Sequence, residues 1–187
     1  MLLLSVFGGC SSSAVDSASE PDKWLDIDET TGETDSVWAE GWPDGLEAIG
    51  EGALLVRSVE SGERMELSWA QQSDIACFPG TQSDRFEGPH LLFALEQKPE
   101  QFLTIRATPE AELDLSLYTL QQGANAYQVP PDISSAVACE ASLSGLSGEA
   151  EEIQLWAPPN PYNLVIGVAG TQGEEEGRFL LEVVRSD

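Results

Sequence analysis

Apolar and polar side chains alternate along most of residues 53–187. At Leu103, Ile105 and Ala107, for example, the polar residues Thr104 and Arg106 occupy the positions between the apolar ones. Successive side chains of a β-strand point to opposite faces of its sheet, so such a run presents one apolar face to a core. Runs of this kind occupy residues 65–69, 103–107, 113–117, 153–157, 164–168 and 179–183.

Turn-forming residues separate these runs. Clusters of Pro, Gly, Asn and Gln occur at residues 79–80, 121–125, 130–131, 158–161 and 171–173, and no window has the 3.6-residue period of a long amphipathic helix. The pattern predicts an all-β fold: an antiparallel, jelly-roll-like β-sandwich of about eight strands over residues 53–187.

The stretch before residue 53 has a different character. Residues 11–52 hold twelve acidic side chains and one lysine, a net charge of −11, with sparse apolar positions and no period. We therefore expect residues 10–52 to form a disordered acidic tether that self-repulsion keeps extended. Trp24, Trp38 and Trp42 are costly to leave in water, and they either dock on the chain's own domain or anchor a partner.

The first ten residues form a short apolar run that ends in Gly8, Gly9 and Cys10 and is followed by serines. Small residues directly before a cysteine resemble the lipobox of bacterial lipoprotein precursors. The resemblance implies a signal peptide at residues 1–9, whose natural start we expect upstream of Met1, and acylation of Cys10, with palmitate as the expected chain. It also implies membrane attachment in the cell envelope, with Ser11 favouring the outer membrane or cell surface. The alternative is a buried N-terminal strand that ends in cysteine.

The sandwich region carries a second resemblance. Glu-Leu-Asp-Leu-Ser-Leu-Tyr at residues 112–118, the segments at 161–170 and 177–183, and the strand at 90–95 resemble bacterial pre-peptidase C-terminal domains. The resemblance implies a small jelly-roll-like β-sandwich that serves as an accessory module of exported proteins. That family has no catalytic residues to carry over.

Two cysteines remain once Cys10 is assigned to lipid. An even number in an exported chain favours a Cys77–Cys139 disulfide, and the alternative is two buried free thiols. His90, the single histidine, follows Gly88 and Pro89 at a strand entry, where we expect it to be exposed or capping. One histidine and two scattered cysteines do not complete a four-ligand zinc site.

Charge excludes one class of partner. The chain has 33 acidic and 8 basic residues and a net charge of −25, of which −14 lies in residues 53–187. Nucleic acid and bare anionic lipid would repel it. Two acidic runs beside turns are either solvated surface or loop-end calcium ligands that relieve their own repulsion. Their members are Glu149, Glu151, Glu152, Glu174, Glu175 and Glu176.

No nucleophile–base–orienter set is recognisable, because His90 is the single imidazole and no Gly-x-Ser-x-Gly elbow occurs. We therefore predict a non-catalytic cell-envelope lipoprotein without a cofactor, displaying a β-sandwich that binds an envelope or extracellular protein or glycan. The alternatives are a carboxylate-dependent glycan hydrolase and a calcium-stabilised adhesion module. Adaptation to concentrated salt would explain the acidity and is compatible with each of these functions.

Overall fold

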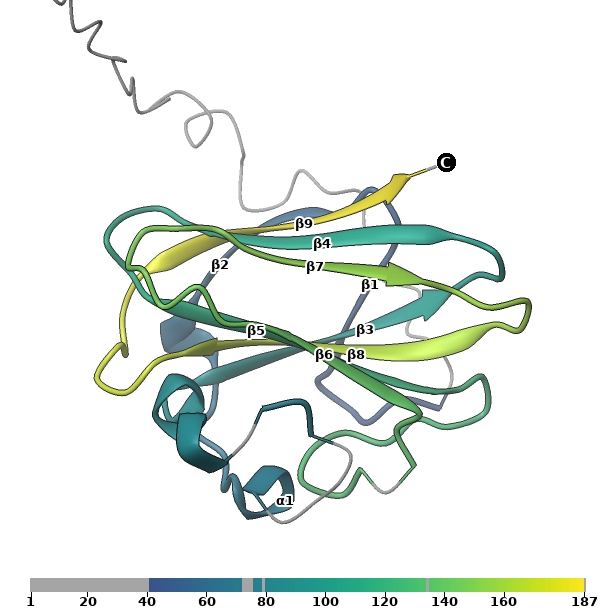
Figure 1. Cartoon of the computed structure of the whole chain (residues 1–187), viewed down its shortest axis with the longest axis horizontal. Coiled ribbons are helices and arrows are strands. Elements are labelled where there is room, and N and C mark those ends of the chain that lie inside the picture. The colour runs from purple at the N-terminus through teal and green to yellow at the C-terminus, as the bar shows by residue number, and fades with distance from the viewer. Residues whose placement is uncertain (1–40, 72–75, 79, 134, 187) are drawn as a thin grey trace, which may run out of the picture.

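Two β-sheets pack face to face in a computed structural model that describes residues 41–71, 76–78, 80–133 and 135–186 (Figure 1). One sheet has five strands in the order β1-β3-β8-β5-β6, and the other has four in the order β2-β9-β4-β7. The predicted all-β sandwich is confirmed, with nine strands in the described ranges rather than about eight. No helix within these ranges has the length and apolarity to cross a bilayer. The strands are β1 (Glu47–Ile49), β2 (Leu54–Ser58), β3 (His90–Gln97), β4 (Phe102–Pro109), β5 (Leu115–Gly123), β6 (Ala138–Ser142), β7 (Glu151–Trp156), β8 (Tyr162–Gly170) and β9 (Arg178–Ser186).

The main core lies between the two sheets and is built from the alternating runs. Leu103 and Ile105 of β4 meet Leu117 of β5, Ile166 of β8 and Phe179 of β9, and all five side chains are fully buried. Neighbouring strands are antiparallel except for β1 and β3, which pair in parallel.

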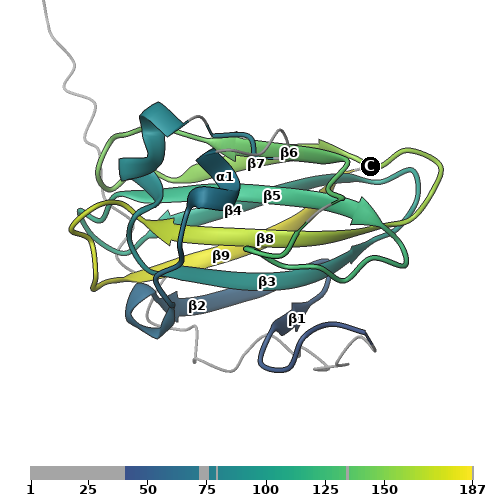
Figure 2. The same cartoon turned by 90° about the horizontal axis from the view of Figure 1, so that it is seen from below.

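A third layer covers the outer face of the five-stranded sheet. It contains α1 (Ser68–Gln71) and η3 (Gly80–Phe86), which Figures 1 and 2 show on the side of this sheet away from its partner. The remaining short helix, η2 (Val59–Ser61), follows β2, and its Val59 is buried in the main core. The third layer leaves β5 and β8 buried on both faces along most of their length. From Leu164 to Gly170 β8 is a continuous apolar run, as in strands covered on both sides, whereas β5 also buries Ser116 and Thr119. A second apolar cluster fills this layer, with Trp69, Phe78, Phe86, Tyr118, Leu120 and Val165 among its members.

The predicted strand at residues 65–69 is wrong. Leu67 is buried just before α1, and Trp69 and Ala70 are buried within it, all in the second cluster, so their apolar character serves a single helical turn. Short apolar runs do not distinguish a strand from a buried helical turn by periodicity alone.

The sandwich begins before residue 53, so the predicted end of the tether at residue 52 is too late. β1 lies within the range 10–52, and its Ala48 pairs with Ala94 of β3. Trp42 packs edge-on against Tyr127, with 5.4 Å between ring centroids. Of the two alternatives for the tryptophans, docking on the chain's own domain therefore holds for Trp42. The signal peptide at 1–9, Cys10, Trp24 and Trp38 lie outside the described residues.

Candidate functional site

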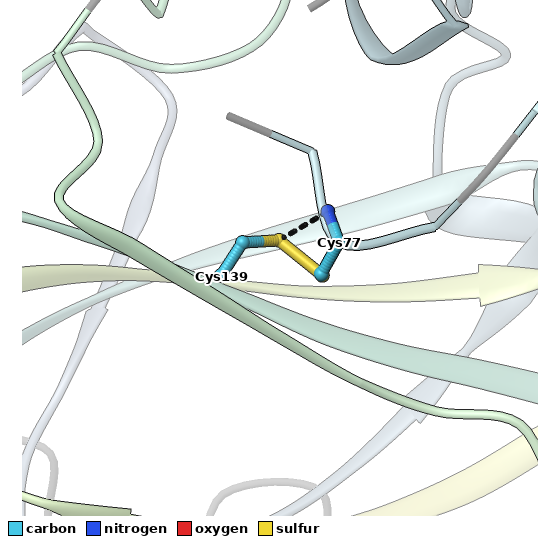
Figure 3. Close-up of a disulfide and its surroundings, with 2 residues drawn as sticks. All are labelled: Cys77 and Cys139. Atoms are coloured by element: carbon cyan, nitrogen blue, oxygen red, sulfur yellow. Dashed lines mark hydrogen bonds between the residues drawn. A yellow bond between two sulfur atoms is a disulfide. The ribbon is translucent and has the colours of Figure 1, made fainter. Parts of the chain in front are cut away.

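A disulfide joins the third layer to the edge strand β6 (Figure 3). The Cα atoms of Cys77 and Cys139 are 5.1 Å apart, and the backbone N–H of Cys77 lies 3.0 Å from Sγ of Cys139. The predicted pairing is confirmed. Its location beside the second cluster gives it a structural role, because it holds the covering layer against the sheet.

His90 is buried, contrary to the expectation of an exposed or capping residue. Its side chain is 4% exposed, with Nε2 2.7 Å from the carbonyl oxygen of Phe86 and Nδ1 3.0 Å from the hydroxyl of Tyr118. Burial lowers the pKa of His90, partly offset by the hydrogen bond to Phe86. Both ring nitrogens are engaged inside the protein, so the imidazole has a structural role.

The six carboxylates proposed for calcium do not gather at one point. Glu151 is 1% exposed and accepts hydrogen bonds from the backbone N–H and hydroxyl of Ser144, whereas Glu152 is exposed and accepts from Gln154. Glu175 pairs with Arg64. In the ranges the structure describes, no three His, Cys, Asp or Glu side chains are grouped as metal ligands would be.

A glycan hydrolase of the expected kind needs two neighbouring carboxyl groups, one of them with a raised pKa. Asp114 and Glu151 come nearest to this requirement. Burial raises the pKa of Asp114; Arg85 opposes this rise, Glu151 adds to it, and a hydrogen bond with Thr171 opposes it. Neither the Asp114 nor the Glu151 carboxyl group lines the groove beside β1 and β3, nor the smaller groove around Arg64, Glu66 and Gln71.

An aromatic pair marks the outer face of the four-stranded sheet. Trp156 ends β7 and is 60% exposed, and it lies directly opposite the half-buried Phe102 of β4. The ring centroids are 6.4 Å apart and the ring planes are tilted by 41°. Val184 of β9, 51% exposed, lies on the same face one row further along β4. We call Trp156, Phe102 and Val184 the aromatic platform.

Polar side chains continue this face beyond the platform. Thr104 is paired across the strands with Gln154 on one side and Val184 on the other, and the next row holds Arg106 between Glu152 and Glu182. Rows on one face of a sheet are about 7 Å apart. The face thus passes from aromatic through amide and hydroxyl to charged groups.

A second candidate surface is a groove of about 720 Å³ beside β1 and β3. Apolar side chains from four segments line it, and Arg57 of β2 and Arg64 also contribute. We call it the edge groove. Its apolar members include Leu46, Met65, Leu92, Val129 and Pro131, and its acidic members are Asp44, Glu47 and Glu63.

Sequence reasoning missed both surfaces. Trp156 occupies an outward position between the core residues Leu155 and Ala157. A large aromatic side chain at a position where the strand pattern expects a polar one could have indicated a binding surface. The edge groove had no signal of this kind, because it joins residues from 43 to 131 that only the fold brings together.

No protein-family model and no curated protein matches the chain. Among solved structures, it is similar to the pre-peptidase C-terminal domain of a collagenase from Bacillus anthracis, with 13% identity, a TM-score of 0.41, and coverage of 75% of this chain and 96% of that one. It is also similar to PliG of Aeromonas hydrophila, a periplasmic inhibitor of g-type lysozyme, with 12% identity, a TM-score of 0.39, and coverage of 74% of this chain and 96% of that one. A third similar structure is CorA, a surface-associated copper-binding protein of Methylomicrobium album BG8, with 12% identity, a TM-score of 0.42, and coverage of 75% of this chain and 98% of that one.

Proposed function

We propose that the chain is a non-catalytic cell-envelope lipoprotein whose β-sandwich binds a neutral glycan on the aromatic platform. The observation that carries the proposal is the exposure of Trp156, 60%, beside the ring of Phe102. Leaving an indole in water on a folded domain is unfavourable, and exposed aromatic side chains with a polar surround mark binding sites.

A sugar ring suits this surface chemically. The face of an indole ring is electron-rich, and the C–H groups on one side of a sugar ring carry partial positive charge, so the two stack. Gln154 and Thr104 lie one row away and supply amide and hydroxyl groups that donate to and accept from sugar hydroxyls. An acidic glycan would be repelled by the domain, whose net charge is −14, so the proposed ligand is a neutral glycan.

A large protein interface suits the platform less well. A stable protein partner covers about 800 Å² on each side and buries an apolar centre. The apolar part of this face consists of Trp156, Phe102 and Val184 at one corner, and the rows beyond them turn polar and then charged.

Calorimetric titration of the full chain in detergent with cellohexaose, chitohexaose and mannohexaose tests the proposal. We expect one of them to bind, and Trp156→Ala to weaken binding at least about tenfold, since truncating an exposed aromatic anchor costs at least about 1.4 kcal/mol. Leu146→Ala is the matched control, because Leu146 is 58% exposed away from the platform. Binding of none of the three, or equal binding by Trp156→Ala, would overturn the platform.

Chromatography of the same mixtures separates binding from hydrolysis. We expect the oligosaccharides to remain intact after prolonged incubation. Shorter products that disappear in an Asp114→Asn or Glu151→Gln variant would establish the hydrolase alternative instead.

The lipid anchor is a separate part of the proposal and rests on Cys10 and the small residues before it. We expect Cys10→Ala to move the protein from the membrane fraction to the soluble fraction with unchanged far-ultraviolet circular dichroism. Unchanged detergent-dependent partitioning of this variant would refute acylation at Cys10.

A further inference from the structure

The edge groove lies where the five-stranded sheet is narrowest. β1 has three residues and covers β3 only from Phe93 to Leu95. The start of β3 is bridged by Glu63, whose backbone exchanges two hydrogen bonds with His90. Between these two contacts the surface is hollowed, and the volume of about 720 Å³ is enough for several side chains of a ligand.

The lining of the groove offers apolar contact that a partner can use. Met65, Leu92 and Val129 are each only partly buried, and they pack against the second cluster from its margin. Pro131 is exposed at the rim. Methionine is unbranched and adapts its shape to different partners, so Met65 gives the groove tolerance for more than one side chain.

The charges of the groove are not balanced. Arg57 is held by Glu47, with Nε 3.0 Å from Oε2, and Arg64 is held by Glu175 and by the carbonyl oxygen of Glu87. Both arginines that line the groove are therefore already neutralised. Asp44 and Glu63 are exposed, and among the described residues neither has a cationic partner. The uncompensated charge is negative.

We infer that the edge groove binds a short protein segment in which lysine or arginine stands beside apolar side chains. The apolar floor takes the apolar side chains, and Asp44 and Glu63 attract the cations. Anionic membranes and nucleic acids are repelled by the same carboxylates and by the net charge of the domain. This site is distinct from the aromatic platform and does not depend on glycan binding there.

Fluorescence anisotropy of the full chain in detergent tests the inference with a labelled octapeptide of alternating lysine and leucine. Two further octapeptides are the peptide controls, one with glutamate in place of lysine and one with serine in place of leucine. We expect the first to bind and both controls to bind at least about tenfold more weakly. Binding of the lysine–serine peptide equal to that of the lysine–leucine peptide would overturn the apolar part of the inference.

Matched protein variants locate the site. Asp44→Asn with Glu63→Gln should weaken binding at least about tenfold, and Met65→Ser should weaken it severalfold. The control is Glu112→Gln with Glu149→Gln, which changes the net charge by the same amount at exposed residues outside the groove. An equal loss of peptide affinity in the two double variants would show that binding depends on the net charge of the domain and not on Asp44 and Glu63, and would overturn the site. Trp156→Ala should leave peptide binding unchanged, so the peptide result stands or fails independently of glycan binding on the platform.

Discussion

The hydroxyl of Tyr118 donates a hydrogen bond to Nδ1 of His90, with 3.0 Å between the two atoms. Nε2 lies 2.7 Å from the carbonyl oxygen of Phe86, which only accepts, so Nε2 carries a proton. Burial lowers the pKa of His90 and so favours the neutral imidazole, in which Nδ1 has no proton and accepts from the fully buried phenol.

This neutral histidine predicts a pH-dependent stability. Burial lowers the pKa of His90 in the folded protein, whereas the unfolded chain titrates near about 6.5. Between these two values the unfolded state binds a proton that the folded state does not. The free energy of unfolding therefore falls as pH is lowered through this window, by up to about 1.4 kcal/mol per pH unit.

Urea denaturation between pH 4.5 and 7.5 measures this slope. His90→Asn does not titrate in the window, and the carboxylates are common to both proteins, so the difference between the two slopes isolates His90. The same slope in both proteins would show that His90 has the same pKa in the folded and unfolded states, and would contradict the lowered pKa.

Gly167 should not tolerate a side chain. It lies opposite Tyr118 in the β5–β8 pair, and a Cβ at this position would be 2.0 Å from Cζ of the ring. We expect Gly167→Ala to destabilise the domain by about 1–3 kcal/mol through overpacking, seen as a lower melting temperature. Gly123→Ala, also in β5–β8 register, is the control, because a Cβ there has open space. Equal melting temperatures for the two variants would contradict the packing described here.

Removing the disulfide should destabilise the domain without disrupting the main core. The bridge spans 62 residues, and closing a loop of this length contributes about 4 kcal/mol in the chain-entropy model. We expect Cys77→Ser with Cys139→Ser to lower the urea midpoint by a corresponding amount. The wild-type chain in reducing agent should match the double variant, and a midpoint that does not move in either would count against the bridge.

The buried carboxylate of Glu151 should depend on Ser144. The serine hydroxyl and backbone N–H both donate to it, and Glu151 is 1% exposed. Ser144→Ala removes one donor from a buried charge and should cost about 1–3 kcal/mol in the free energy of unfolding. Ser147→Ala is the control, at an exposed position three residues away. An equal, small effect of both would mean that water replaces the hydroxyl.

The alternating runs predicted β4, β5, β7, β8 and β9, and the cleanest alternation belongs to strands with one face on the main core. β4 and β7 alternate cleanly because their other faces point away from the partner sheet, and period-two patterning reports that geometry. β1, β2 and β6 were not predicted. β6 is Ala-Cys-Glu-Ala-Ser at the edge of its sheet, where small side chains give no hydrophobic alternation.

The third layer and the binding surfaces depend on long-range contacts that patterning does not record. The burial of His90 is set by Tyr118, 28 residues later in the sequence, and the local Gly-Pro context gave no sign of it. The cysteine pairing was predictable from the lipobox resemblance, because setting Cys10 aside leaves one possible pair among the three cysteines. The platform was partly predictable, because Trp156 interrupts the polar side of an otherwise regular strand.

The two ends of the domain differ in how they are hydrogen-bonded to the sheets. The chain enters through β1, three residues at a sheet edge, and it leaves through β9, nine residues hydrogen-bonded to β2 on one side and β4 on the other. Tension between the N-terminal segment and a ligand on the sandwich would load β1 first and peel it from β3. Because Leu46 and Glu47 line the edge groove, that same step would dismantle one wall of the groove, so stretching the chain would release whatever the groove holds.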